Sequence, residues 1–206
     1  MQADKMKNAF LTLLCAAAVL LPASCGDDKV TQPEPKPTVH FKDLQDKDDV
    51  LFNLELAYNE RQFVEYDKLL DDNFMFILSE DDYNSGKVDV PQWDRVLEIS
   101  VNRRIFNPAL AAENRVISID LNLDYGPDGW TEQPPNQDHP GESWYVKTAE
   151  YDLVMKTADD WEHRALGLYA EFTVRWAQTT GGEHWRIVVW RDDVSPPPTP
   201  VSEGVY

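Results

Sequence analysis

The chain has 206 residues, of which 42% are hydrophobic, and this length and composition fit one folded domain with an apolar core. Acidic residues outnumber basic residues by 37 to 19, and the net charge of −18 excludes binding to nucleic acid through bulk attraction and disfavours anionic lipid surfaces. The two cysteines, Cys15 and Cys25, are too few for a disulfide framework or a thiolate metal site.

A short apolar segment from Ala9 to Leu21 follows two lysines near the start of the chain. A helix that spans a bilayer needs about 20 apolar residues, whereas the apolar part of a secretion signal has roughly 7–15. The segment therefore predicts a signal peptide rather than a membrane-spanning helix.

The next residues, Ala23-Ser24-Cys25, resemble a bacterial lipobox, although Pro22 stands where that pattern prefers Leu. The resemblance implies a lipoprotein signal peptide over residues 1–24 and a lipid on Cys25, which anchors the mature chain in the cell envelope. Gly26 is not the Asp that holds many such lipoproteins at the inner membrane, so the outer membrane is expected. The alternatives are an ordinary signal peptide that is cleaved nearby and a chain that is not secreted.

Polar segments rich in Pro flank the rest of the chain. Residues 25–40 alternate Pro with polar side chains, which predicts an extended tether. Residues 194–206 predict a disordered tail or, alternatively, a docking peptide for an aromatic groove. The folded domain is expected over residues 41–193, a length that is ample for a stable core.

Apolar residues at helical spacing predict three helices in the first part of this domain. The first covers Asp48–Tyr58, and the second covers Phe63–Leu70 and precedes a short apolar strand, Phe74–Leu78. Pro91, after a polar loop, predicts the first residue of a third helix that ends near Phe106. The expected apolar face of this third helix holds Trp93, Val96, Leu97, Val101 and Ile105.

After Arg115 the period of the apolar residues changes to two, which predicts an antiparallel meander of four strands. The strands are expected at Ile117–Tyr125, Trp144–Lys156, Leu166–Trp176 and Trp185–Arg191. Strands of this length must twist and curve, and the helices must cover one face of the sheet. We therefore predict an α+β fold in which a curved antiparallel sheet wraps around the N-terminal helices.

Three segments resemble the NTF2-like (SnoaL-like) superfamily: Leu69–Phe76, the pair Tyr151–Val154 and Ala170–Val174, and the closing strand Trp185–Trp190. The resemblance covers residues 45–192 and implies the cone of the cystatin-like and NTF2-like folds. None of the segments is a catalytic motif. Superfamily members include isomerases, dehydratases, cyclases and binding subunits, so the fold alone assigns no function.

Enzymes of this superfamily hold a carboxylate or a His inside the cone, which directs attention to the inner face of the sheet. The alternation places Glu150, Asp152, Glu171 and Arg175 on the outer face, where they are expected to form cross-strand charge pairs. We therefore predict no catalytic residue. The three acids are candidates for a general base only if this assignment of faces is reversed.

The aromatic residues on the inward phases are expected to form mainly core, with space for a pocket at the mouth of the cone. Trp93, Tyr151 and Lys147 are the predicted lining of this ligand pocket. The acidic loop Glu80–Gly86 lacks the ligand spacing of an EF-hand, and the four His are scattered along the chain. No metal and no cofactor is predicted.

These observations favour a membrane-tethered, non-catalytic protein that binds a small apolar ligand or a protein partner. One alternative is a cofactor-independent isomerase or dehydratase that uses Glu150, Asp152 or Glu171. Another is an interaction module that forms a homodimer through the outer face of its sheet.

Overall fold

The computed structural model describes residues 39–86, 89–111, 115–127, 129–134, 139–179, 182–192, 194 and 196. The predicted signal peptide, Cys25, most of the predicted tether and most of the predicted tail lie outside these residues. A compact unit begins at Phe41, and the buried residues of its apolar core all lie between Leu44 and Trp190. The described apolar core therefore lies entirely within this unit.

The helices lie close to where the apolar spacing predicts them. α2 (Lys47–Asn59) and α3 (Phe63–Leu69) follow one another, and α5 (Arg95–Ile105) comes later in the chain. Asp46 caps α2, because its carboxylate accepts a hydrogen bond from the backbone N–H of Asp48 at 2.9 Å. The segment predicted as a polar loop contains one further short helix, α4 (Glu80–Asn84).

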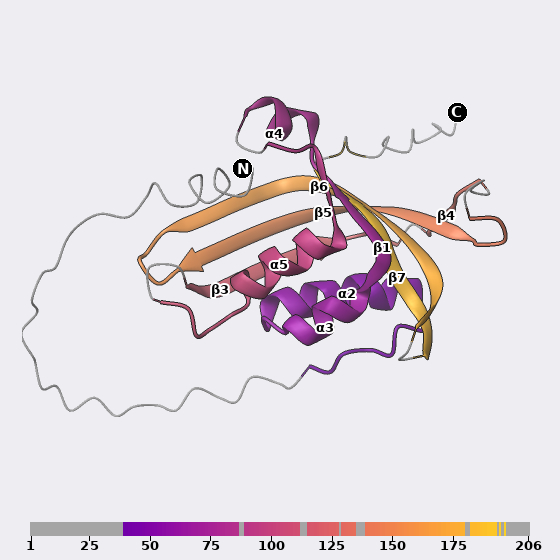
Figure 1. Ribbon diagram of the computed structural model, residues 1–206, viewed down its shortest axis with the longest axis horizontal. Helices are drawn as coiled ribbons and strands as arrows, with labels where there is room; N and C mark the ends of the chain where they lie inside the picture. Colours follow the sequence, from indigo (N-terminus) through magenta and orange to yellow (C-terminus); the bar gives the residue numbers. More distant parts are fainter. Residues whose placement is uncertain are drawn as a thin grey trace, which may run out of the picture. The chain divides into compact units, whose positions relative to one another are not determined.

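The strands form one sheet. They are β1 (Leu70–Ile77), β2 (Gln92–Asp94), β3 (Val116–Asp124), β4 (Thr131–Glu132), β5 (Trp144–Thr157), β6 (Glu162–Thr179) and β7 (Gly182–Arg191). Their order is β2-β1-β7-β6-β5-β3, with β4 beside β5, and all pairs are antiparallel except β1 with β7. The sheet curves around α2, α3 and α5 (Figure 1), which is the predicted α+β architecture.

The inner face of the sheet is apolar along most of its length, as the alternation predicts. Its buried residues come from three neighbouring strands: Ile119, Leu121, Leu123, Ala149, Tyr151, Ala170, Phe172 and Val174. They pack against buried side chains of α2 and α3, among them Leu51, Leu54 and Tyr66. The hydrophobic burial that stabilises the domain therefore lies between the helices and this face.

Three residues that the alternation assigns to the inner face are exposed, so these predictions are wrong. Ile117, Leu166 and Trp176 are 47%, 52% and 40% exposed. Shifts of register place bulges at Ile117 in β3 and beside Gly167 in β6, and a bulge takes a residue out of the alternation. Trp176 keeps the phase of Val174, but it lies beside the β6–β7 turn, where it packs edge-on against Trp185.

The predicted start of the third helix at Pro91 is also wrong. Residues Gln92–Asp94 form strand β2, which pairs with β1, and α5 begins at Arg95. The ring of Trp93 stacks on that of Phe76 in the opposite strand, with centroids 4.3 Å apart. Asp94 then caps α5, because its carboxylate accepts a hydrogen bond from the N–H of Leu97 at 3.1 Å.

The inward face of α5 differs from the predicted apolar face. Val96 is 77% exposed, and the buried side chains of the helix are those of Glu98 and Asn102. A carboxylate therefore does point into the interior, but it comes from a helix and not from the strands. Within the described residues, no helix combines the length and apolar composition that crossing a bilayer requires.

Candidate functional site

A buried polar cluster surrounds Glu98 on the inward side of α5. Glu98 is only 3% exposed and accepts hydrogen bonds from three side chains. Trp93 Nε1 donates to it at 2.5 Å, Asn102 Nδ2 donates at 2.6 Å, and the hydroxyl of Tyr66 is the third donor. The carboxyl group is thus held in one position by residues of α3, β2 and its own helix.

Two further hydroxyl groups border this cluster. The ring of Tyr58 lies edge-on to that of Tyr66, with centroids 5.4 Å apart. On the other side, the hydroxyl of Tyr151 donates to Asp192 Oδ1 at 2.5 Å, directly after the end of β7. Aromatic hydroxyl groups that are buried need polar partners: that of Tyr58 has Tyr66 and Asn102, and that of Tyr151 has the carboxylate of Asp192.

Burial dominates the electrostatics of the cluster. It raises the pKa of Glu98 above its ordinary value, and the nearby charge of Asp192 acts in the same direction, while hydrogen bonds from Tyr66, Trp93 and Asn102 oppose the shift. Burial also raises the pKa values of Tyr58 and Tyr66, so both remain protonated and able to donate. The carboxyl group of Glu98 therefore holds its proton to a higher pH than an exposed glutamate does.

The structure brings two of the three predicted pocket residues to this cluster. Trp93 contacts Glu98 directly, and Tyr151 borders it through Asp192. Lys147 lies elsewhere: its ammonium group bonds to Asp48 at 3.1 Å and lies 5.0 Å from the centre of the Tyr125 ring. The structure does not bring Lys147 together with the other two residues.

The three acids named as candidates for a general base lie on the outer face of the sheet. Glu150 accepts a hydrogen bond from the hydroxyl of Tyr169 at 3.0 Å, and Asp152 accepts one from the N–H of Gly167 at 2.7 Å. Glu171 pairs with Arg191, which is directly opposite it in β7, at 2.6 Å. Each acid therefore has a partner on the outer face.

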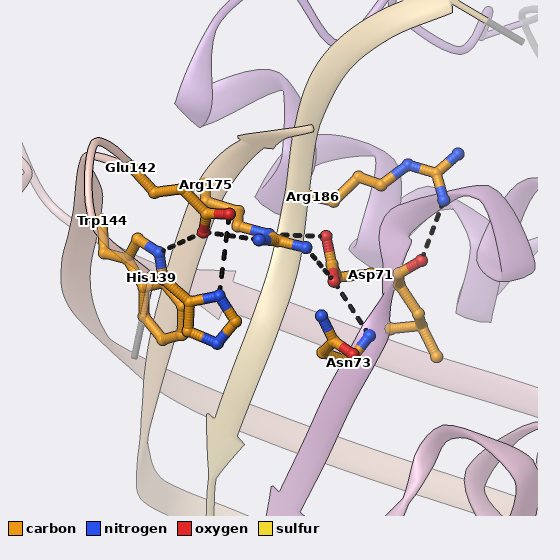
Figure 2. A network of polar contacts seen from close by, with 8 residues as sticks. Asp71, Asn73, His139, Glu142, Trp144, Arg175 and Arg186 are labelled. Atoms are coloured by element: carbon orange, nitrogen blue, oxygen red, sulfur yellow. Dashed lines mark hydrogen bonds and ion pairs between the residues drawn. The ribbon is translucent and has the colours of Figure 1, made fainter. Parts of the chain in front are cut away.

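A second polar network lies on the outer face of the sheet (Figure 2). Arg175 of β6 makes two hydrogen bonds to Asp71 of β1, at 2.8 and 2.9 Å, and a third to Glu142 at 2.5 Å. Asp71 is almost completely buried, although its outer-face position gives no such signal in the sequence. Burial alone opposes ionisation of Glu142, but hydrogen bonds from Arg175 and Trp144 hold its pKa below the ordinary value.

This network borders a polar hollow of about 210 Å³, whose lining includes Asp72 and Gln178. Because Arg175 is already bound by two carboxylates, the hollow offers no free cation to a ligand. Within the described parts of the chain, no cluster of three or more His, Cys, Asp or Glu residues has the arrangement of a metal site.

A larger groove of about 500 Å³ lies beside the first part of β7, before Ile187, where β7 begins to pair with β1. It is lined by the segment Phe41–Leu44, by Asn53 of α2, by Glu65, Lys68 and Leu69 of α3, and by His184 and Arg186 of β7. Sequence analysis did not predict this groove, because its walls come from four separate segments. Glu98 lines neither the groove nor the smaller hollow.

The sequence gives one signal for the Glu98 cluster, which is the spacing of Glu98 and Asn102. Residues four apart lie on the same face of a helix, so the two polar side chains point in one direction. Nothing in the local pattern shows that this direction is inward. That follows only from the positions of Tyr66 and Trp93, which belong to other elements.

Comparison with known proteins finds similarity only among solved structures. No family model and no curated protein matches the chain. A conserved protein from Planctomyces limnophilus has a TM-score of 0.46 and 12% identity, and the match covers 72% of this chain and 92% of that one. An NTF2-like protein from Rhodospirillum rubrum has a TM-score of 0.43 and 14% identity, with 74% and 100% covered.

A protein with a cystatin-like fold from Caulobacter vibrioides has a TM-score of 0.40 and 13% identity, and the match covers 73% of this chain and 87% of that chain. The structures that resemble this chain thus include NTF2-like and cystatin-like folds. At these scores the likeness concerns the arrangement of helices and strands, and we draw no argument about function from it.

Proposed function

We propose that the mature chain is a non-catalytic binding protein of the cell envelope, which takes up a small apolar ligand in the groove beside β7. Its tether is a lipid on Cys25, in the outer membrane, as the lipobox-like sequence and the Pro-rich segment after it suggest. Ligand pockets typically have volumes of roughly 300–1,000 Å³ and a mainly apolar lining with a few polar groups. The groove of about 500 Å³ lies within this range of volumes, and its lining combines the apolar residues Phe41, Leu44 and Leu69 with polar and charged side chains.

The observation that carries the proposal is the state of Glu98. A general base must reach the proton that it removes, directly or through one water molecule. Glu98 is buried, is held by three donors and borders neither the groove nor the polar hollow. Its position supports a structural role, and the space for a ligand lies elsewhere.

Native mass spectrometry tests the proposal. The chain is purified from its own membranes, and the same chain with Phe41→Asp, which places a charge in the groove wall at a partly exposed position, is the control. We expect a small molecule to remain bound to the unchanged chain and to be lost from the variant. A ligand-free mass in repeated preparations would count against a small-molecule function and favour a protein partner.

A cofactor-independent isomerase or dehydratase is the second candidate, and the raised pKa of Glu98 favours it. In this case Glu98, rather than Glu150, Asp152 or Glu171, is the general base, with Tyr66 as a hydrogen-bond donor. Incubation of the co-purified molecule with the protein in D₂O tests it, since proton abstraction next to a carbonyl group leads to deuterium uptake. Uptake that Glu98→Gln abolishes would establish this function, and no uptake would exclude it.

A further inference from the structure

We propose that the ligand of the groove beside β7 is a single-chain amphipathic carboxylate, with its acid group bound by the cationic side chains of the groove. The inference rests on the proposed function and names the class of ligand. It follows from the division of the groove into an apolar wall and a cationic side.

The apolar wall of the groove, formed by Phe41 and Leu44, is fixed in place by backbone contacts of the segment Phe41–Leu44. The backbone N–H of Lys42 donates to Asn53 Oδ1 at 2.9 Å, and Asn53 Nδ2 donates to the carbonyl oxygen of Lys42 at 2.8 Å. The carbonyl oxygen of Leu44 accepts from the N–H of Trp185 at 3.1 Å. The segment is therefore held between α2 and β7, so Phe41 and Leu44 form a preorganised surface for an alkyl chain.

The cationic side consists of Arg186, Lys68 and Lys42, with the imidazole of His184 among the polar lining. The acidic residues of the lining are Asp43 and Glu65, so the groove carries three basic and two acidic side chains in a chain of net charge −18. Lys42 is paired with Asp49 at 3.1 Å, and its side chain is 45% exposed. Glu65 bonds to Lys68 at 2.7 Å, but both side chains are partly exposed, and such pairs contribute little. A ligand carboxylate can therefore replace Glu65 at Lys68 at small cost.

Arg186 is the strongest reason for an acid group. It is only 9% exposed, and its Nη1 donates to the carbonyl oxygen of Leu70 at 3.1 Å, which fixes the guanidinium group beside the first residue of β1. Burial lowers its pKa below the ordinary value, although Asp72 and Asp71 act in the opposite direction. A carboxylate in the groove would offset this loss of solvation, and guanidinium groups bind carboxylates with two parallel hydrogen bonds.

Calorimetric titration with decanoate and with decanol tests the inference, on the chain that begins at Gly26. The two probes have the same alkyl chain and differ in the acid group. We expect decanoate to bind at least about tenfold more tightly than decanol, because hydrogen bonds to charged groups are stronger than neutral ones. Arg186→Met should remove this preference.

Because Arg186 is buried, its variant can lose stability, so a second variant uses exposed residues. Lys68→Gln combined with His184→Gln should weaken decanoate binding severalfold and leave decanol binding unchanged. Lys156→Gln is the matched control, since Lys156 is as exposed as Lys68 and is also paired with a glutamate, Glu162, but lies far along the sheet on β5.

The outcomes separate this inference from the proposed function. Equal affinity for decanoate and decanol, with decanol binding lost in Phe41→Asp, would overturn the acid group and leave an apolar binding site. Weaker decanoate binding in Lys156→Gln, to the same extent as in the double variant, would show attraction by overall charge and also overturn it. Absence of binding by both probes, with no co-purified ligand, would overturn both proposals.

Discussion

Glu98 illustrates how a buried acid makes stability depend on pH. Its pKa is raised in the folded state, mainly by burial, whereas in the unfolded chain it titrates near 4.3. Below that pH both states hold the proton. As the pH rises, the unfolded state releases the proton first, so the folded state loses stability until the pH passes the folded pKa.

Glu98→Gln removes this ionisation while it keeps the shape of the side chain. We expect the free energy of unfolding of the unchanged protein to fall relative to that of the variant as pH rises above about 4, with a slope of up to about 1.4 kcal/mol per pH unit. Urea unfolding of both proteins from about pH 4 to about pH 8 measures the difference. A difference that stays constant over this range would show that Glu98 is not perturbed.

Arg175 and Arg191 form a matched pair of residues on the outer face of the sheet. Arg175 contacts Asp71, whose side chain is 2% exposed, whereas Arg191 contacts Glu171 and is itself half exposed. We expect Arg175→Met to lower the free energy of unfolding by about 3 kcal/mol, because it leaves a buried carboxylate without its cation. Arg191→Met should cost less than about 1 kcal/mol.

Urea unfolding of the two variants at neutral pH provides the comparison. If Asp71→Asn together with Arg175→Met restores most of the loss, the cost comes from the unpaired charge. Equal losses in the two single variants would contradict the difference in burial on which the prediction depends.

At the scale of single residues, alternation within a strand is the most informative property of this sequence. It identifies Glu150, Asp152 and Glu171 as outer-face residues, and their observed partners lie on that face. It does not identify Glu98 or Asp71. Their burial depends on Tyr66 and Arg175, which are distant in sequence, and on Trp93, which lies in a different element, and local periodicity holds no information on such contacts.

At the scale of elements, the start of α5 shows that a capping residue outweighs a favourable Pro. Pro91 is suited to the first turn of a helix, but the residues after it form β2, in which Trp93 stacks on Phe76. The helix begins only after Asp94, which caps it. We expect Asp94→Ala to lower the free energy of unfolding by about 1 kcal/mol, the usual cost of losing a cap. Asp89→Ala, in the exposed segment before β2, is the control and should change stability by less than about 0.5 kcal/mol.

Chemical denaturation of both variants checks this prediction, and circular dichroism shows whether helix content falls with it. If Asp94→Ala and Asp89→Ala behave alike, the hydrogen bond from Leu97 N–H to Asp94 contributes nothing measurable.

Bulges are the elements that the sequence could not predict. In β7, Ile187 and Trp190 pair with Val174 and Phe172, so both face the interior although they are three residues apart. The register shift at Val188 makes this possible, since a bulge adds one residue to the repeat of two. The sequence Ile187-Val188-Val189-Trp190 is apolar throughout, so alternation has no contrast from which a bulge can be recognised.

At the scale of the whole molecule, composition and periodicity are enough to predict the fold class but not to predict which strand pairs with β7. The helices and the antiparallel strands follow from local patterns. The parallel pairing of β1 with β7 joins segments that are more than a hundred residues apart, and the groove lies where this pairing begins, beside Leu69 and Arg186. The best-supported ligand site therefore depends on the contact that is hardest to derive from sequence.

The same long-range contacts predict where the folded unit must begin. Phe41 to Leu44 adds a buried Leu, two hydrogen bonds with Asn53 and one with Trp185 to the unit. We expect a chain that begins at Phe41 to match one that begins at Gly26 within about 0.5 kcal/mol, since the described core starts at Leu44. A chain that begins at Gln45 should lose about 3 kcal/mol, from one buried Leu and the lost hydrogen bonds.

Urea unfolding of the three chains tests this boundary, and decanoate titration of the same samples links it to the groove. Only the chain that begins at Gln45 lacks the apolar wall, so it alone should lose decanoate binding. If that chain keeps both its stability and its affinity, the segment Phe41–Leu44 is not part of the folded unit, and the groove beside β7 is not the ligand site.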